Sequence, residues 1–387
     1  MITNGLILYL FMVNSHFIPT ETSPLTKENL KVELVQVLFR HGARTAIGCE
    51  SDLLHDTEAS FYPWGFAQLT TEGMQQEYQI GRMLRERYDG FLPTLFNQKH
   101  VYAYSSGFAR TKASLELVLS ALYPPVNEYI WNSKLNWMPI PIHSNPKQLD
   151  ILNKPRYCPK FINLLLDLYN STELKQEISK HDEIRAMLKD VYGREFNFGY
   201  TFCAYNSLVV QKSLDLPLPD WYTDEKFKKL HDAASFYLNT LSYTKELKRA
   251  NGGTYVRRFV ENMNDTNSAK GRKIYLYASH DKSLHAIARF HNITLPRIPD
   301  YGSAIVVEKL RDQKNNRYVR LLFWSGSPKK LTVLRIDECA EICPMEQYLK
   351  IVTPMLPSDD DMLCLFRSIN PENLGTILNS DTTAIDN

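Results

Sequence analysis

No stretch of this sequence is apolar for long enough to cross a membrane as a helix, which takes about 20 residues. An excess of one charge is also missing, because 45 Lys and Arg stand against 43 Asp and Glu and the basic residues are scattered. Nucleic-acid binding is therefore not expected, since it needs a basic patch or stripe. There is no internal repeat, and the composition, 44% hydrophobic and 23% charged, is that of an ordinary globular protein.

The apolar run from Gly5 to Val13 is too short to span a bilayer, and the small residues up to Ser15 suit signal cleavage. We therefore predict a secretory signal over residues 1–15, with a helix buried against the core as the alternative, because no Lys or Arg precedes the run. Six cysteines fit an oxidising compartment, although six allow 15 pairings. Three sequons provide glycosylation sites if the chain is secreted: Asn170, Asn264 and Asn292.

Strand and helix patterns alternate in the first third of the chain. The β-branched run at 31–39 predicts a buried strand, and 70–88 predicts an amphipathic helix with Thr70 or Thr71 as its N-cap. A second strand is expected at 101–105 and a second helix at 110–122. This order is typical of an α/β fold.

The middle of the chain changes to prolines and aromatics followed by amphipathic helices, and strand patterns return at 273–279, 303–309 and 318–324. We predict an α/β fold in which helices flank a central, mostly parallel sheet, with an inserted helical cap domain. The expected divisions are an α/β catalytic domain at 16–124 and 265–356, a helical cap domain at 125–264, and a C-terminal tail at 357–387.

Three of these strands, far apart in sequence, are each followed by residues suited to phosphate chemistry. These residues are Arg40, His41 and Arg44 after the first strand, Arg110 after the second, and His280 with Asp281 after the third. Ligands of open α/β sheets bind beyond the carboxyl ends of the strands, so we expect one pocket to receive all six side chains. Three guanidinium groups near one point are explained by a multiply charged anion, such as a phosphate monoester.

Two of the three remaining groups, His41 and Asp281, have a chemical role in this hypothesis. Neighbouring cations disfavour protonation of His41, which keeps a nucleophilic nitrogen available in mildly acidic solution. An alcohol departs poorly as alkoxide, so the reaction needs a proton donor, and Asp281 is the candidate. The negative charge of the substrate favours the protonated form of Asp281, which predicts activity below neutral pH.

Other interpretations of these residues are possible. Arg40 and Arg44 could pair with surface carboxylates while His41 caps a helix. The i, i+4 pair Asp281 and His285 could bind a metal, but no further ligand cluster with suitable spacing is present. Cys339 and Cys343 could form half of a zinc site, although a small disulfide loop is the better interpretation because the other half is missing.

The segments VLFRHGART, SSGFARTKASL and YASHD resemble the histidine acid phosphatases, closest to the prostatic, lysosomal and insect venom types. The resemblance covers nearly all of the chain after residue 15. It implies His41 as nucleophile, Asp281 as proton donor, no metal or other cofactor, and often a homodimer. It also implies the phosphate ligands Arg40, Arg44, Arg110 and His280.

The resemblance further implies the disulfides Cys158–Cys364 and Cys339–Cys343, and leaves the pairing of Cys49 and Cys203 open. Two positions depart from the family pattern. Ala109 stands where an acidic residue usually precedes the arginine, and Ala46 stands where proline is common. Both departures bear on the orientation of the site rather than on its chemistry.

The leading hypothesis is a secreted, metal-independent acid phosphatase acting on small-molecule or protein phosphate monoesters; a lysosomal location is less favoured. One alternative is a secreted protein of the same fold that acts mainly by binding, with weak turnover. Another is a phosphatase devoted to an inositol polyphosphate, which would need further Lys or Arg along a wide pocket.

Overall fold

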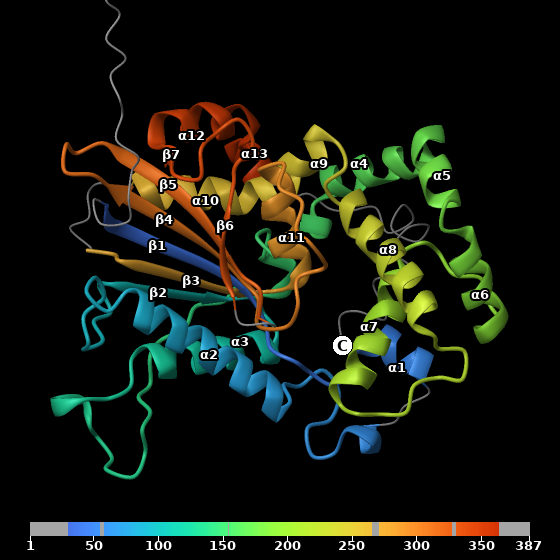
Figure 1. Cartoon of the computed structure of the whole chain (residues 1–387), viewed down its shortest axis with the longest axis horizontal. Coiled ribbons are helices and arrows are strands. Elements are labelled where there is room, and N and C mark those ends of the chain that lie inside the picture. The colour runs from blue at the N-terminus through green and yellow to red at the C-terminus, as the bar shows by residue number, and fades with distance from the viewer. Residues whose placement is uncertain (1–29, 55–57, 154, 265–270, 327–329, 364–387) are drawn as a thin grey trace, which may run out of the picture.

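The computed structural model describes residues 30–54, 58–153, 155–264, 271–326 and 330–363 (Figure 1). The described residues form a seven-stranded sheet in the order β2-β3-β1-β4-β5-β6, with β7 pairing with β5. The strands are β1 (Lys31–Arg40), β2 (Val101–Ser105), β3 (Ile274–Ser279), β4 (Ala304–Arg311), β5 (Arg317–Trp324), β6 (Leu331–Leu334) and β7 (Cys343–Pro344).

The α/β fold with flanking helices is confirmed, and the sheet is mixed. The pairings β1 with β3 and β2 with β3 are parallel, whereas β4 is antiparallel to β1, and β5, β6 and β7 continue antiparallel. The expected mostly parallel sheet is therefore corrected to a sheet whose parallel part is limited to β1, β2 and β3. The difference arises because short connections join β4, β5 and β6, and short connections allow only antiparallel neighbours.

Helices cover both faces of the sheet (Figure 1). One face packs on α2 (Thr71–Arg87) and α3 (Ala109–Leu122). The other face packs on α10 (Gly252–Asn264), α11 (Asp281–Phe290) and α12 (Met345–Val352). Alternate residues of β1 serve the two cores, Val35, Val37 and Phe39 on one side and Leu34 and Leu38 on the other, as the period of two in a strand requires.

Among the described residues, six α-helices between α3 and α10 lie beside the sheet and are called the helical part here (Figure 1). Side chains cap several of them, as Thr223 does for α8 by accepting a hydrogen bond from the Lys226 N–H at 3.1 Å. The short α1 (Gly48–Leu54) joins this group, and α13 (Asp359–Met362) lies near the end of the described chain. The helical part comprises α4 (Pro159–Asn170), α5 (Thr172–Ser179), α6 (Asp182–Tyr192), α7 (Tyr200–Ser213), α8 (Asp224–Thr240) and α9 (Lys245–Ala250).

The structure settles part of the cysteine chemistry. The expected Cys339–Cys343 disulfide is confirmed, so these two residues do not form half of a zinc site. The pairing left open is a disulfide between Cys49 and Cys203. Cys364, the expected partner of Cys158, and the predicted signal at 1–15 lie outside the described residues. Within the described ranges, no helix has the length and apolar character needed to cross a membrane.

The loop after β1 is held against the start of α2 by two glycines. A Cβ atom on Gly42 would lie 2.2 Å from the Gly73 carbonyl oxygen, and one on Gly73 would lie 2.0 Å from the Ala43 carbonyl oxygen. Thr70 caps α2 at this contact by accepting a hydrogen bond from Gly73 N–H at 3.2 Å. Only glycine permits two backbones to approach this closely.

We therefore predict that Gly42→Ala lowers the free energy of unfolding by at least about 1–3 kcal/mol, because its Cβ has to displace backbone rather than a side chain. Denaturation by urea, followed by circular dichroism, measures this. The matched control is Gly90→Ala, since a Cβ at Gly90 meets nothing within 4 Å, and its effect stays within about 0.5 kcal/mol. Equal stability of the two variants would contradict the close packing at Gly42.

Candidate active site

The parallel register brings the ends of three strands to one point. Arg40 at the end of β1 lies opposite Ser279 of β3, and Ser105 of β2 lies opposite Ala278. Backbone hydrogen bonds extend the ladder beyond the strands, from His41 N–H to the Ser279 oxygen at 3.1 Å and from Ser106 N–H to the Ala278 oxygen at 3.0 Å. The residues that follow the three strands are therefore neighbours, as the sequence predicted.

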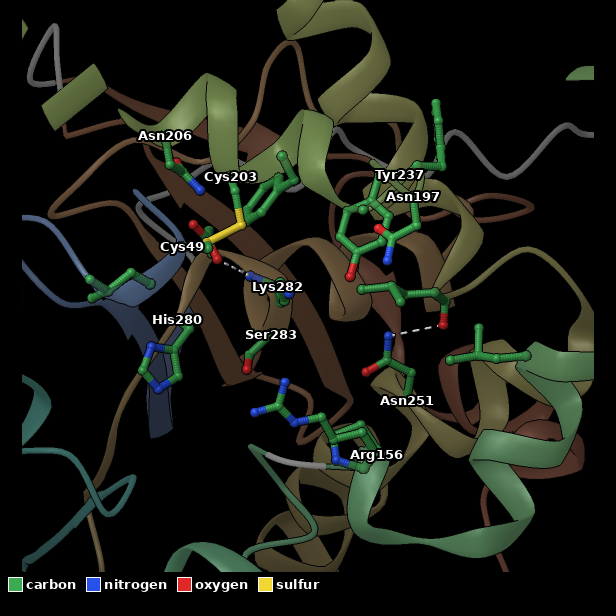
Figure 2. A pocket seen from close by; sticks show the side chains of 18 of the residues that line it. Cys49, Arg156, Asn197, Cys203, Asn206, Tyr237, Asn251, His280, Lys282 and Ser283 are labelled. Carbon is green, nitrogen blue, oxygen red and sulfur yellow. Dashed lines mark hydrogen bonds between the residues drawn. A yellow bond between two sulfur atoms is a disulfide. The ribbon is translucent and has the colours of Figure 1, made fainter. Parts of the chain in front are cut away.

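A cavity of about 350 Å³ opens at this edge of the sheet. Five of the six predicted site residues line it: His41, Arg44, Arg110, His280 and Asp281. In Figure 2, His280 and the Cys49–Cys203 disulfide lie toward one side of the cavity, and Tyr237 and Asn251 lie toward the other. The cavity thus extends from the strand ends into the helical part.

Arg40, the sixth residue, reaches the cavity through Asp281. Its Nη2 lies 3.0 Å from Oδ2 of Asp281, and its Nη1 donates to the Pro299 carbonyl oxygen at 2.6 Å. The guanidinium also stacks over the Tyr301 ring, 4.0 Å from its centroid. The other oxygen of Asp281 accepts from the Lys282 N–H at 2.7 Å at the start of α11, so this carboxylate is held at both oxygens.

Arg44 is held by a carboxylate that our sequence analysis did not identify. Its Nη1 and Nη2 donate to the two oxygens of Glu50 at 2.6 and 2.8 Å, and both side chains are buried. Burial works to lower the pKa of Arg44, but the negative charge of Glu50 outweighs this effect and raises it. The surface pairing that we considered for Arg40 and Arg44 is therefore wrong, because both pairs are buried.

Arg110 differs from the other two arginines. Among the described residues it forms no ion pair, and its guanidinium lies over the Phe108 ring, 4.5 Å from the centroid. Ala109, which precedes it, is exposed at the first position of α3 and offers no carboxylate. Burial, followed by the nearby charge of Arg44, lowers the pKa of Arg110 to about 9.

The protonation of His41 follows from its contacts. Its Nδ1 lies 2.9 Å from the Gly42 carbonyl oxygen, and because a carbonyl can only accept, the proton is on Nδ1 and the lone pair is on Nε2. The ring is buried and lies 5.3 Å from the ring centroid of His280. Burial first, and then the charges of Arg110 and His280, lower the pKa of His41 well below the ordinary histidine value.

A chain of hydrogen bonds orients His280. The Thr111 hydroxyl donates its proton to backbone carbonyl oxygens. In its 2.8 Å hydrogen bond with Ser106 Oγ, Thr111 is therefore the acceptor and Ser106 the donor. Ser106 Oγ then accepts from Nε2 of His280 at 3.1 Å. His280 is the N-cap residue of α11 but makes no side-chain capping bond, which argues against a purely capping role for the His280–Asp281 pair.

The metal alternative involved His285, whose Nε2 lies 3.1 Å from Oδ1 of Asn239. In the part of the chain that the structure describes, no three His, Cys, Asp or Glu residues come together in a way that could hold a metal ion.

Beyond the strand ends, the cavity wall is largely apolar and aromatic, and sequence analysis did not predict which residues form it. Its side chains come from α4, α5, α7 and α8 and from the chain next to these helices: Phe161, Leu165, Tyr169, Ile178, Phe198, Phe202, Tyr237 and Leu241. Three cations also line the wall, namely Arg156, Arg185 and Lys282. The wall residues are far apart in the sequence, so no local pattern indicates that they line one cavity. Glu50, in contrast, lies only six residues after Arg44 and could have been tested as its partner.

Comparison with known proteins agrees with this geometry. Residues 31–324 match the histidine phosphatase superfamily (branch 2). The venom acid phosphatase of Apis mellifera is 33% identical over 86% of this chain and 88% of its own length, and the prostatic acid phosphatase of Homo sapiens is 29% identical over 92% of each.

Solved structures share the fold at much lower identity. The Hafnia alvei phytase in its apo form superposes with a TM-score of 0.67 at 15% identity, covering 87% of this chain and 99% of the phytase. At such identity the likeness concerns the fold alone. The family match spans most of the chain and includes every strand end described above, and on that basis the chain belongs to branch 2 of the histidine phosphatase superfamily.

Proposed function

We propose that this protein is a secreted acid phosphatase that hydrolyses phosphate monoesters through a phosphohistidine on His41. One observation carries the proposal: a buried imidazole with a free Nε2 lone pair stands among arginines of which two are neutralised and one is not. Such a site holds, next to a nucleophilic nitrogen, a positive charge that has no ion-pair partner among the described residues and can bind an anion. The named activity of the venom and prostatic relatives supports it.

The first step forms a bond between Nε2 of His41 and phosphorus while the ester P–O bond breaks. Arg110, Arg44 and His280 bind the phosphoryl oxygens, and Arg40, the fourth predicted ligand, is paired with Asp281. Asp281 gives its proton to the departing alkoxide, which leaves as the alcohol.

The second step returns the phosphoryl group to water. The alcohol has left with the proton of Asp281, so the carboxylate can accept a proton from the attacking water. The P–N bond to His41 breaks as the new P–O bond forms, and inorganic phosphate is released. Both steps use the same acid and base, and no step requires a group other than side chains and water.

Two disulfides and the exposure of three sequon asparagines support the proposed secretion. Cys49–Cys203 and Cys339–Cys343 need an oxidising compartment, and the side chains of Asn170, Asn264 and Asn292 are exposed, as glycan attachment requires. Relatives include enzymes named venom, prostatic and lysosomal acid phosphatase.

The roles of His41 and Asp281 can be separated with two substrates. We expect His41→Ala to abolish hydrolysis of both an alkyl phosphate and para-nitrophenyl phosphate. Asp281→Asn should slow the alkyl phosphate by about 10²–10⁴-fold but the nitrophenyl ester much less, because nitrophenolate leaves without a proton. Steady-state rates measured in EDTA test this. Equal losses on both substrates would refute the proton-donor role, and loss of wild-type activity in EDTA would refute the mechanism.

The acid limb of the pH profile reports His41. Because its pKa is lowered, the nucleophile stays neutral until the pH falls through that depressed value, so kcat/KM holds below the ordinary histidine pKa. Arg110 makes the largest charge contribution to the lowered pKa of His41, so Arg110→Gln raises that pKa and moves the acid limb to higher pH. We also expect kcat/KM to fall by about 10²-fold, because a phosphate ligand is lost. Arg110→Lys keeps the charge and keeps the limb in place. Superimposable limbs for all three proteins would count against the assigned cause.

Three cations in the cavity wall, Arg156, Arg185 and Lys282, meet the requirement stated for a polyphosphorylated substrate. Apolar side chains nevertheless make up most of the wall, so we expect it to favour one hydrophobic leaving group. A series of linear alkyl phosphates from ethyl to hexyl tests this, since its leaving groups share nearly the same chemistry. We expect kcat/KM to rise about two- to fourfold per added methylene, corresponding to at most about 0.8 kcal/mol each. A flat series, or a preference for inositol hexakisphosphate over hexyl phosphate, would show that the wall does not select the substrate.

A further inference from the structure

We propose that Glu50 is a positioning residue for Arg44, and that the Cys49–Cys203 disulfide keeps Glu50 in place. The inference rests on the proposed phosphate site, because Arg44 matters here as a phosphate ligand. It adds to that site a carboxylate and a cross-link that line the same cavity and act through Arg44.

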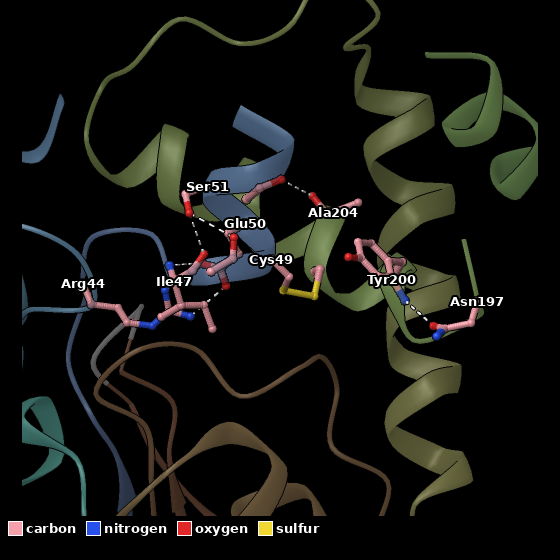
Figure 3. The surroundings of a disulfide bond; sticks show 11 residues. Arg44, Ile47, Cys49, Glu50, Ser51, Asn197, Tyr200 and Ala204 are labelled. Atoms are coloured by element: carbon pink, nitrogen blue, oxygen red, sulfur yellow. Dashed lines mark hydrogen bonds and ion pairs between the residues drawn. A yellow bond between two sulfur atoms is a disulfide. The ribbon is translucent and has the colours of Figure 1, made fainter. Parts of the chain in front are cut away.

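Glu50 uses both carboxylate oxygens to fix the guanidinium. Oε1 accepts from Nη2 of Arg44 at 2.8 Å, and Oε2 accepts from Nη1 at 2.6 Å and from the Ile47 N–H at 3.0 Å. Arg44 Nη1 also donates to the Thr45 carbonyl oxygen at 3.0 Å. Figure 3 shows Arg44 extended toward Glu50 and Ile47 at the start of α1. A two-point pair of this kind leaves the guanidinium plane one orientation.

The position of Glu50 in turn depends on α1, which has seven residues. A helix this short is not stable by itself, so tertiary contacts must hold it. Cys49 and Leu53 of α1 are buried in the core of the helical part, together with Phe202 of α7. The disulfide then joins Cys49 to Cys203 of α7, with their Cα atoms 6.0 Å apart (Figure 3). Glu50 is therefore adjacent in sequence to the covalent link that joins the segment after β1 to α7 of the helical part.

The charge of Glu50 alone would work against the proposed reaction. A buried carboxylate beside a phosphate site repels the substrate and neutralises an arginine that could otherwise attract it. Its presence is explained if the gain in orienting Arg44 exceeds this loss. The two effects have opposite signs, which makes them separable by experiment.

The experiment compares Glu50→Gln with Glu50→Asp, using inorganic phosphate as the probe. Dissociation constants from calorimetry and inhibition constants against an aryl phosphate are measured on the full chain. If Glu50 positions Arg44, both variants weaken phosphate binding, by about tenfold, the loss expected for a misplaced charge-assisted pair. If Glu50 acts through charge alone, Glu50→Gln tightens binding and Glu50→Asp leaves it unchanged, and the proposal is overturned.

The disulfide is tested with Cys49→Ala/Cys203→Ala, which we expect to weaken phosphate binding in the same direction. Adding Glu50→Gln to this pair should cause little further loss, because the two changes interrupt the same support. The matched control, Cys339→Ala/Cys343→Ala, removes a disulfide outside the cavity and leaves phosphate binding unchanged. If the first pair does not fold, Cys49→Val/Cys203→Ala, which refills part of the sulfur volume, replaces it.

Three results distinguish the possible failures. Lowered melting temperatures with unchanged phosphate affinity in the Cys49 and Cys203 variants would show a purely structural cross-link and overturn its positioning role. Fully additive losses would show that Glu50 and the disulfide act independently, which also overturns that role. A wild-type protein that neither binds phosphate nor hydrolyses any monoester would instead refute the proposed function.

Discussion

Two buried ion pairs, Arg40 with Asp281 and Arg44 with Glu50, decide how charge is distributed at this site. Burying a guanidinium is costly unless a carboxylate accompanies it, and each pair meets that requirement locally. Arg110 has no such partner among the described residues, so its positive charge is the one left for a ligand. Burial first, and then the same uncompensated charge, lower the pKa of His41, so the arrangement that would attract an anion also favours the neutral imidazole.

The mixed sheet explains why the site draws on more than three strand ends. In a parallel pair the carboxyl ends meet at one edge, which places His41 and His280 side by side. Because β4 runs antiparallel to β1, with Ala304 opposite Phe39, it is the beginning of β4 that reaches this edge. Tyr301, just before β4, therefore lies under the Arg40 guanidinium. Our expectation of a mostly parallel sheet considered only strand ends and missed this residue.

Much of the α/β half could be predicted because its signals are local. The strand at 101–105, the cap at Thr70 and the cluster around His41 follow from residues within a few positions of one another. The residues of the cavity wall could not be predicted, since Phe161 and Tyr237 come to line one cavity only after the helical part folds. The partner of Cys203 was equally hidden, because Cys49 lies 154 residues away and spacing carries no information at that range.

The chain changes from one half of the molecule to the other within the loop that carries the chemistry. Arg40 and His41 belong to the end of β1, whereas Cys49 and Leu53 are already buried in the core of the helical part. Arg44 lies between these two anchors, so any shift of one half against the other acts first on its guanidinium. The sheet alone can fix His41, the proposed nucleophile, but the proposed phosphate ligands and the apolar wall hold a common geometry only while both halves remain joined. A covalent link next to Glu50 is therefore placed where relative motion of the halves would most disturb the site.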